Sequence, residues 1–286
     1  MESLPYRGST SSFYRFDSGT VLKSPMKVWE GNPNRERLQA ENEVAIRFEG
    51  QILYKLGSHP RIVPFVDPPN LHSRGLSNNR YLGPHTPSGG ILLSQASHGT
   101  LQAYLDSNNT AIDKSLRWKW SVQAVEAVAH VHSQGVIHSD LKPENYLVHA
   151  TADGSSLDLW LCDFGGSTCR ELGHSIPHLP DDPFFDVRMP WIPTEAIDIF
   201  SLGSIIYTIL TGHWPYREGT PPLKLDDIGF YETYVNEMIT KGVFPDVSSL
   251  RAGKVIRGCW DHQYQTTKEV LEAMRLELAA LDKEDV

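Results

Sequence analysis

Cysteine is scarce in this sequence. Its three cysteines, Cys162, Cys169 and Cys259, are odd in number, and their spacing matches neither a zinc site nor a disulfide framework. Thiols that remain free are typical of a reducing compartment. The sequence therefore predicts buried or idle thiols in an intracellular protein, with a cytoplasmic location expected and the nucleus not excluded.

Long hydrophobic runs are absent as well. The most apolar stretch, IDIFSLGSIIYTIL at 197–210, is shorter than the roughly 20 residues that a membrane-spanning helix needs, and it contains an aspartate. The opening residues, MESLPYRGST, lack the apolar core and the basic start of a secretory signal. We therefore expect no membrane partner and interpret 197–210 as a buried helix.

Positive charge is in deficit. The 26 Lys and Arg residues face 35 Asp and Glu residues, which gives a formal net charge of −9. Because an acidic chain gains nothing from the phosphates of DNA or RNA, nucleic acid is not expected as a main partner. The remaining composition, 40% hydrophobic and 21% charged over 286 residues, is that of a globular protein with one large domain or two lobes.

The expected secondary structure changes character along the chain. Residues 67–90 are rich in Pro, Gly, Ser and Asn and predict a loop or insertion. Strands are expected within a twisted hairpin over 6–23 and at 60–66, 91–95, 146–148 and 157–163. Helices are expected over 34–56, with Leu38, Val44, Phe48 and Ile52 near one face, over 116–134, and through most of the chain after 193. Strands first and helices later indicate an α+β fold with two lobes.

Polar residues of several kinds gather in the stretch VIHSDLKPENYLV at 136–148, between two apolar runs. A hairpin that follows would bring Asn145 close to Asp163, and their oxygens are the ligands that Mg²⁺ prefers. Asp140 would then accept a proton from a hydroxyl nucleophile, while Lys142 neutralises charge on a transferring phosphoryl group. An ordinary polar turn between a helix and a hairpin is the alternative interpretation.

The residues HSDLKPEN resemble the catalytic loop HRDLKPEN of eukaryotic protein kinases, and Asp163-Phe164-Gly165 resembles the metal-binding motif of that family. The two motifs occur in the family's order, with their aspartates 23 residues apart (163 − 140). The resemblance extends from about residue 6 to 274 and is strongest to serine/threonine kinases of fungal type. It implies a small antiparallel-sheet N-lobe over about 1–95, a hinge near 94–98 and a larger, mainly helical C-lobe over about 99–286.

The same resemblance assigns roles to single residues. Asp140 becomes the catalytic base, and Asn145 and Asp163 become Mg²⁺ ligands. Lys142 occurs where serine/threonine kinases carry lysine, which implies a Ser or Thr acceptor in a protein substrate. Lys23, in TVLK, matches the strand lysine that holds the ATP phosphates. The alternative for that position is Lys27.

Glu49 matches the helix glutamate that pairs with this lysine, with Glu41 and Glu43 as alternatives on the same charged helix. In ILLSQASHGTL, Leu93 would lie beside adenine, and backbone groups around Ser94 and Ala96 would bind the base. A plain buried strand is the alternative there. Asp198 is implied to fix the catalytic loop by accepting backbone N–H groups.

The sequence also departs from the family pattern. The phosphate-covering loop retains one glycine of three, Gly8, with Tyr6 and Ser11 at the other two positions. Ser139 replaces the arginine of the HRD motif, so activity is not expected to wait for a phosphate on the segment after Asp163.

The A-P-E motif is not recognisable either. Its acid would fall at Asp186 (198 − 12), and Tyr264 stands where the arginine partner would be. We expect both halves of this ion pair to be missing together, which is far less costly than losing one.

Three functions fit these residues. The leading hypothesis is a kinase that transfers the γ-phosphoryl group of Mg-ATP to Ser or Thr hydroxyls of proteins, because Lys23, Glu49, Asp140, Asn145 and Asp163 are all of the required types. A pseudokinase that acts as a binding or scaffolding module is the second, supported by the degenerate glycine loop. A kinase fold that acts on small molecules or lipids is the third. The sequence predicts neither the substrate protein nor the oligomeric state.

Overall fold

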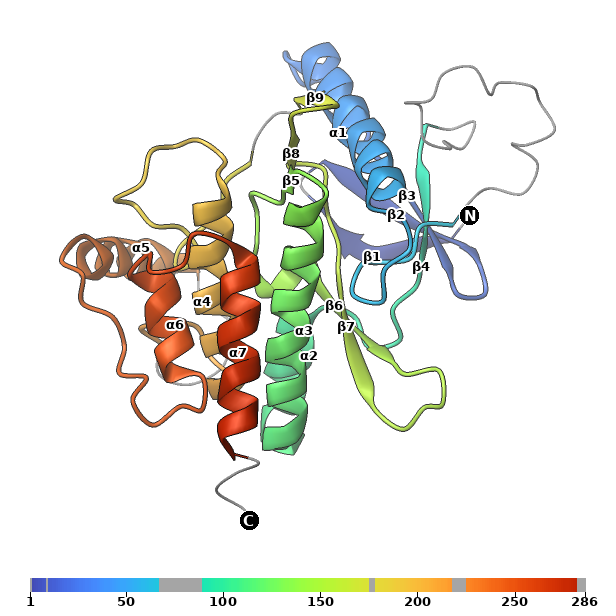
Figure 1. Ribbon diagram of the computed structural model, residues 1–286. Helices are drawn as coiled ribbons and strands as arrows, with labels where there is room; N and C mark the ends of the chain where they lie inside the picture. Colours follow the sequence, from blue (N-terminus) through green and yellow to red (C-terminus); the bar gives the residue numbers. More distant parts are fainter. Residues whose placement is uncertain (1, 9, 67–88, 175–177, 218–224, 282–286) are drawn as a thin grey trace.

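The computed structural model describes residues 2–8, 10–66, 89–174, 178–217 and 225–281, and these form two lobes (Figure 1). A four-stranded antiparallel sheet and one long helix make up the N-terminal lobe, and the later helices make up most of the C-terminal lobe. The expected α+β, two-lobed fold is confirmed. The expected insertion at 67–90 lies mostly outside the described residues, and the lobe boundaries near 95 and 99 stay a prediction.

The N-terminal sheet has the strand order β1-β2-β3-β4, with antiparallel neighbours throughout. Its strands are β1 (Ser3–Arg7), β2 (Ser11–Asp17), β3 (Thr20–Pro25) and β4 (Ile91–Ser94). Strands β2 and β3 meet in a tight turn where Gly19 has a φ of 89°, a conformation that glycine adopts without strain. The hairpin expected over 6–23 is therefore present, and β1 extends it at the outer edge.

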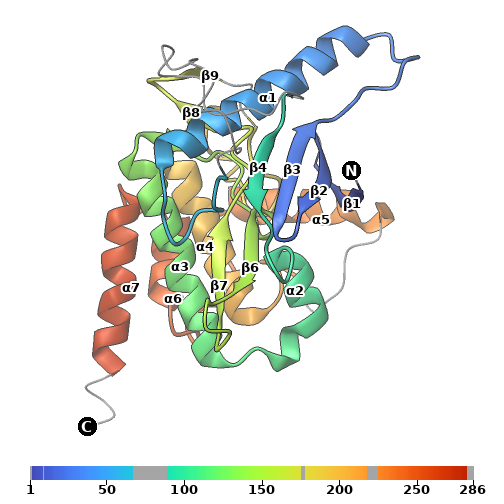
Figure 2. The same cartoon turned by 90° about the vertical axis from the view of Figure 1, so that its right-hand side faces the viewer.

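Helix α1 (Arg35–Leu56) packs against β3 and β4 (Figure 2). Its buried stripe passes through Asn42, Ile46, Glu49 and Leu53, which follow one another at steps of four, three and four residues. The expectation that Val44 lies on this face is wrong, because Val44 is 39% exposed. Two residues along a helix turn by about 200°, which places Val44 opposite its buried neighbours. The stripe carries one carboxylate, Glu49, toward the interior.

The strand expected over 60–66 is wrong. This segment makes only the isolated bridges Ile62 to Leu161 and Phe65 to Leu93 among the residues described. Its two prolines lack the N–H groups that a continuous ladder needs, so regular pairing cannot extend through them. The side chain of Ile62 is nevertheless buried, which explains the strand-like pattern of the sequence.

The C-terminal lobe is built around α4, which contacts α3, α6 and α7 (Figure 1). Its helices are α2 (Leu101–Asn108), α3 (Lys114–Ser133), α4 (Glu195–Thr211), α5 (Leu225–Thr240), α6 (Gly253–Trp260) and α7 (Thr267–Leu281). Nearly the whole of α4 is buried, including its polar residues. The interpretation of 197–210 as a buried helix is confirmed. Among the described residues, no helix has both the length and the apolarity to cross a membrane.

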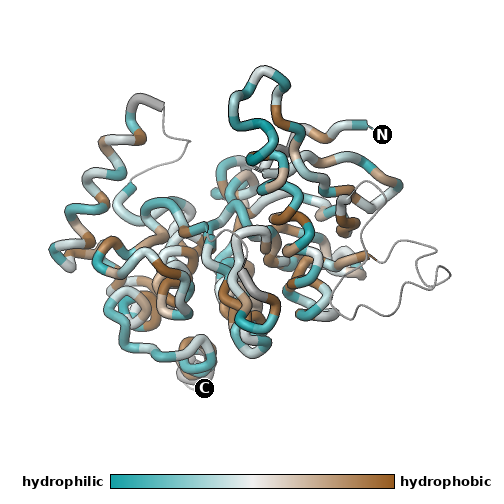
Figure 3. Tube along the Cα trace, turned by 90° about the horizontal axis from the view of Figure 1, so that it is seen from above, coloured by the Kyte–Doolittle hydropathy of each residue, from teal (hydrophilic) through white to brown (hydrophobic). Residues whose placement is uncertain are grey.

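Hydrophobic and hydrophilic residues interleave along the chain in both lobes (Figure 3). Five short strands lie between α3 and α4 in the chain: β5 (Val136–Ile137), β6 (Tyr146–Ala150), β7 (Leu157–Leu161), β8 (Thr168–Cys169) and β9 (Gly173–His174). Strands β6 and β7 form a hairpin, and β5, β8 and β9 form a small sheet. The polar loop 138–145 therefore connects β5 to β6, and Asp163 follows the end of β7.

Arg117 on α3 is a buried cation of the C-terminal lobe. Its guanidinium donates to the backbone oxygens of Ile209, Asn109 and Ile112 and to the side-chain oxygen of Asn109. These bonds join α3 to the end of α4 and to the turn that precedes α3. Burial lowers the pKa of Arg117.

We predict that Arg117→Met lowers the free energy of unfolding by about 3 kcal/mol, because several buried carbonyl groups lose their donor at once. Urea denaturation of both proteins measures this difference. Lys114→Met, at an exposed position of the same helix, is the matched control and should change stability little. Equal destabilisation by the two variants would contradict the proposed role of the guanidinium.

Candidate active site

Lys23 projects from β3 into a cluster of carboxylates. Its Nζ lies 2.6 Å from Glu49 Oε2 on α1 and 2.7 Å from Asp163 Oδ1 after β7. Lys23 and Glu49 are almost fully buried, whereas the side chain of Asp163 is 42% exposed. One ammonium group thus joins three segments that are far apart in the chain. Glu49, rather than Glu41 or Glu43, is the helix carboxylate that pairs with Lys23.

The pKa values of this cluster follow from burial and charge. Burial alone would lower the pKa of Lys23, but the carboxylates of Asp163 and Glu49 outweigh it and raise that pKa. Burial would raise the pKa of Asp163, but Lys23 outweighs it and lowers that pKa. Burial dominates at Glu49 and raises its pKa. Lys23 and Asp163 therefore form a firmly ionised pair.

The loop after β5 is fixed by Asp198, near the start of α4. Asp198 Oδ2 accepts the backbone N–H of His138 at 2.8 Å, and Oδ1 accepts that of Ser139 at 3.0 Å. All three residues are fully buried. Ser139 has a φ of 70°, which is uncommon for a residue other than glycine. The expectation that Asp198 holds this loop through backbone bonds is confirmed.

Asp140 lies at the centre of the loop. Asn145 Nδ2 donates to the backbone oxygen of Asp140 at 2.6 Å and to its Oδ2 at 3.1 Å. Lys142 Nζ lies 3.1 Å from the same Oδ2. Burial would raise the pKa of Asp140, but contacts with His178 and Lys142 outweigh it and hold that pKa at about 2. Asp140 is therefore an ionised carboxylate near neutral pH.

Asn145 and Asp163 lie at the adjoining ends of β6 and β7. The backbone N–H of Cys162 donates to the oxygen of Asn145 at 2.9 Å, and Tyr146 pairs with Leu161 in the next step of the hairpin. The side-chain amide nitrogen of Asn145 is thus directed at Asp140. Its side-chain oxygen is left as an acceptor. Asp163 has a φ of 65°, so the chain bends sharply at this carboxylate. The convergence expected of these two residues is thus present.

Two further residues, which the sequence analysis did not single out, lie against Asp140 and Lys142. His178 Nδ1 is 3.5 Å from Asp140 Oδ1, and Asp181 Oδ2 is 3.6 Å from Lys142 Nζ. Asp140 Oδ1 is closed off from solvent. No motif in the sequence indicates these contacts, because they depend on how the segment after Asp163 folds back over the loop.

The segment expected to contact adenine begins in β4, the strand that pairs with β3 at the edge of the sheet. Leu93 is buried and pairs with Val21 of β3. It lies in β4, where the sequence predicted a strand. The N–H of Ser94 donates to the oxygen of Pro64 at 2.9 Å, so it is engaged within the protein. Any contact of Ser94 with a base therefore falls to its carbonyl group. Beyond β4, Ala96 lies in the connection toward α2.

Gly8 lies just after β1, at the turn into β2. Its N–H donates to the oxygen of Ser11 at 3.2 Å, and a side chain at Gly8 would collide with the buried side chain of Ser11. A side chain at Gly8 would therefore require the hydroxyl of Ser11 to move. The roles predicted for Gly8, Leu93, Ser94 and Ala96 in binding ATP stay predictions.

The expectation that both halves of an ion pair are missing at Asp186 is wrong. Asp186 is fully buried and makes an ion pair with Arg188 at 2.7 Å and a contact with His262 at 2.6 Å. The acid is therefore present, with partners at positions other than Tyr264. An arginine two residues after an aspartate is a signal in the sequence that could have indicated this pair.

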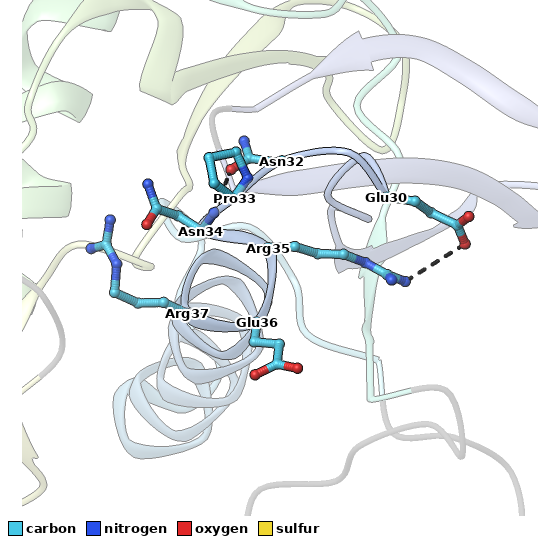
Figure 4. Close-up of a pocket in the computed structure, with 7 residues that line it drawn as sticks. All are labelled: Glu30, Asn32, Pro33, Asn34, Arg35, Glu36 and Arg37. Atoms are coloured by element: carbon cyan, nitrogen blue, oxygen red, sulfur yellow. Dashed lines mark hydrogen bonds and ion pairs between the residues drawn. The ribbon is translucent and has the colours of Figure 1, made fainter.

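A surface hollow lies at the start of α1, away from this cluster (Figure 4). Its lining is polar and exposed, and it includes the ion pair of Arg35 with Glu30 at 3.8 Å. Since Glu49 lies 14 residues further along the helix than Arg35 (49 − 35), about 21 Å separates the two places. The hollow is therefore not part of the candidate site.

Comparison with known proteins agrees with this geometry. A model of the protein kinase domain matches residues 26–267. Lys23 and Gly8 lie before the matched residues, so the family match itself assigns no role to either of them.

Curated relatives are kinases. The serine/threonine-protein kinase ksp1 of Schizosaccharomyces pombe is 31% identical over 143 residues, 48% of this chain and 29% of that protein. The fatty acyl-CoA synthetase and RNA processing-associated kinase 1 of Saccharomyces cerevisiae is 30% identical over 247 residues, 84% of this chain and 25% of that protein. The serine/threonine-protein kinase SBK2 of Rattus norvegicus is 28% identical over 188 residues, 63% of this chain and 46% of that protein.

The chain thus spans less than half the length of each of these relatives. The resemblance to serine/threonine kinases, including fungal ones, is confirmed. On the match over most of its length and on this site, the chain belongs to the protein kinase family.

Proposed function

We propose that this chain transfers the γ-phosphoryl group of ATP, with Mg²⁺, to Ser or Thr hydroxyls of protein substrates. The observation that carries the proposal is the position of Lys23 Nζ, within 2.7 Å of both Glu49 and Asp163. This arrangement gathers a buried cation and an ionised carboxylate beside Asp140 and Asn145. Phosphoryl transfer depends mainly on positioning and on neutralising charge, which such a cluster supplies.

Nucleotide binding falls to residues of both lobes. Lys23 contacts the α- and β-phosphates, and Glu49 holds its ammonium group in place. The Ser94 carbonyl and the backbone of Ala96 bind adenine, with Leu93 beside the ring. Gly8 covers the phosphates at the turn between β1 and β2.

The donor set at the ends of β6 and β7 fits Mg²⁺. Asp163 offers a carboxylate and Asn145 a free amide oxygen, and Mg²⁺ is usually bound by few protein oxygens together with substrate phosphates. The neighbouring charges agree: two cations, Lys23 and Lys142, face three carboxylates, Glu49, Asp140 and Asp163. Within the described part of the chain, no group of three or more His, Cys, Asp or Glu side chains forms a metal site by itself. Asn145 and Asp163 would hold the Mg²⁺, which would supply positive charge against the phosphate oxygens.

Asp140 is the base in the transfer step. The acceptor hydroxyl oxygen bonds to the γ-phosphorus, the bond from that phosphorus to the bridging oxygen breaks, and ADP leaves. The hydroxyl proton passes to the Asp140 carboxylate. Lys142, which burial alone would make less basic, has its pKa raised by Asp140 and stays charged beside the transferring group.

The second candidate function, a pseudokinase that acts as a binding module, is favoured by one observation. Both oxygens of Asp140 are covered, Oδ2 by Asn145 and Lys142 and Oδ1 by His178. A substrate hydroxyl reaches the carboxylate only after His178 moves. A protein acceptor is part of the leading proposal, in line with the serine/threonine-protein kinases among the relatives. A cytoplasmic location is part of it as well.

We predict that Asp140→Asn lowers phosphate transfer by roughly 10²–10⁴-fold, because the acceptor proton loses its base. The measurement is incorporation of labelled phosphate into a histone mixture in the presence of Mg²⁺ and ATP. Asp153→Asn, in the exposed turn between β6 and β7, is the matched control and should behave as wild type. Equal incorporation by wild type and Asp140→Asn would count against catalysis at this site.

Mg-ATP should stabilise the wild-type protein against heat, by ~2.7 kcal/mol at a ligand concentration of 100 Kd. In Asp163→Asn, the increase in melting temperature on adding Mg-ATP should largely vanish, because a metal-binding carboxylate is lost. Asp181→Asn, which removes an exposed carboxylate nearby, should keep it. If wild type itself shows no increase at millimolar Mg-ATP, the binding module without nucleotide becomes the better proposal.

The pH dependence of kcat/KM should report on His178. The close contact with Asp140 raises the pKa of His178 above the roughly 6.5 of a free histidine, against burial and Lys142, and Asp181 adds to the increase. As the pH falls through this raised pKa, His178 gains charge and holds Asp140 more tightly. Activity should therefore fall toward acid pH in wild type.

Two variants separate this effect from other titrations. His178→Asn, which never carries charge, should keep kcat/KM high at mildly acid pH, and His178→Lys, which always does, should keep it low throughout. Since the pKa of Asp140 is about 2, Asp140 itself does not titrate in this range. An unchanged acid limb in His178→Asn would rule out the effect.

A further inference from the structure

Phe13, on β2, is an aromatic residue beside the candidate site to which the proposed function gives no role. It follows the third glycine position of the family pattern by two residues, where that pattern has a valine. The residue is half-buried. A phenyl ring in place of a valine brings an aromatic face to the site, so its position relative to Lys23 decides what it does.

The register of the sheet places Phe13 beside Lys23. The two residues pair across β2 and β3, and paired residues of an antiparallel sheet project from the same face. From this face Lys23 reaches Glu49 of α1 and Asp163 after β7. Phe13 therefore projects into the same space as the ammonium group, and not from the outer face of the sheet.

The ring of Phe13 lies against the ammonium group. Nζ of Lys23 is 5.7 Å from the centroid of the ring, within the range of a cation–π contact. Glu49 Oε2 and Asp163 Oδ1 lie within 2.7 Å of the same nitrogen. The side chain of Lys23 is only 3% exposed, although that of its partner Asp163 is 42% exposed. Two carboxylates and one aromatic ring thus surround the ammonium group.

The backbone at Phe13 is held firmly in this register. Strand β2 pairs with β3 from Ser11 to Arg15 without a break. Just beyond these pairs, the N–H of Met26 donates to the oxygen of Thr10 at 2.8 Å. The strand therefore leaves little room for a shift of Phe13, and the ring leaves the ammonium group by rotation about its own side-chain bonds.

A phosphate group that binds Lys23 meets this ring. The face of an aromatic ring carries partial negative charge, so it attracts a cation and repels an anion. Of the three groups around the ammonium, the ring is uncharged, and its contact is weaker than a charge-assisted hydrogen bond to a carboxylate. The ring is therefore the group that an incoming phosphate displaces at the least cost.

We propose that Phe13 is a shield over Lys23, which the phosphates of a nucleotide must displace before they bind. The shield acts at the ammonium group, so it opposes the phosphates and not the base. It lowers the affinity of the chain for ligands that carry a phosphate. The kinetic part of this proposal rests on the phosphotransfer proposed above, whereas the binding part does not.

Three variants of β2 separate the ring from the strand. Phe13→Val removes the ring, and valine both suits a strand and is the residue of the family pattern. Phe13→Tyr keeps the ring and is the conservative variant. Tyr14→Val removes a ring from the next position of β2, which projects from the opposite face, and is the matched control.

Isothermal titration calorimetry of the full chain with ADP and with pyrophosphate, each in the presence of Mg²⁺, measures the effect. Phe13→Val should bind both ligands roughly twofold to thirtyfold more tightly than wild type, the range that corresponds to the loss of one cation–π contact. The gain should be similar for the two ligands, because it arises at the phosphates. Phe13→Tyr and Tyr14→Val should equal wild type.

Unchanged or weaker binding of pyrophosphate by Phe13→Val would overturn the proposal. Weaker binding of ADP by this variant would overturn it too, because the ring would then support the base. If wild type binds neither ligand, binding gained in Phe13→Val still supports the shield, and no binding in either protein rejects it.

Phosphate transfer gives a second readout. In Phe13→Val, KM for ATP should fall, while KM for a histone mixture should stay as in wild type. If Phe13→Val binds pyrophosphate more tightly but neither protein transfers phosphate, the shield stands and the proposed function fails. If wild type transfers phosphate and Phe13→Val has unchanged affinity for pyrophosphate and ATP, the proposed function stands and the shield fails.

Discussion

The buried ammonium group of Lys23 is the charge on which the arrangement of the site depends. Removing such a group from water costs several kcal/mol, and only well-placed opposite charges offset that cost. Glu49 and Asp163 supply them from α1 and from the end of β7. The cation is therefore compensated only when β3, α1 and the β6–β7 hairpin are assembled together. A single ion-pair cluster thus makes the relative position of the two lobes a condition for a stable site.

Asp198 fixes the backbone of the catalytic loop, as Lys23 fixes the side chains of Glu49 and Asp163. Besides the N–H groups of His138 and Ser139, it bonds to His132 of α3 at 2.8 Å, and His132 in turn contacts Thr267 of α7 at 2.7 Å. The loop is thereby fixed to three helices of the C-terminal lobe. This support holds Ser139 in its positive φ, a conformation that costs of order 1 kcal/mol or more and persists only where the surroundings impose it. The loop keeps its shape without the arginine that the family usually carries.

Motif spacing predicted the convergence of Asp140, Asn145 and Asp163, because a short hairpin leaves little freedom in where its ends lie. The resemblance to the kinase family predicted the pair of Lys23 and Glu49, which the structure contains. The strand expected at 60–66 was wrong because its pairing depends on N–H groups that its prolines lack. The contacts of His178 with Asp140 and of His262 with Asp186 could not be predicted, because they join irregular segments whose path is set by packing and not by local pattern.

The departures from the family pattern differ in how the protein accommodates them. In the C-terminal lobe, the lost arginine partner is replaced by Arg188 and His262, so the buried acid stays paired. In the N-terminal lobe, the loop near Gly8 keeps one glycine, and the buried side chain of Ser11 fills the space beside it. Packing alone explains the first substitution, since an unpaired Asp186 would destabilise the fold whatever its activity. Packing does not explain Lys142 in the same way, because its side chain is partly exposed beside Asp140 and pairs there with a carboxylate that the proposed phosphoryl transfer would use.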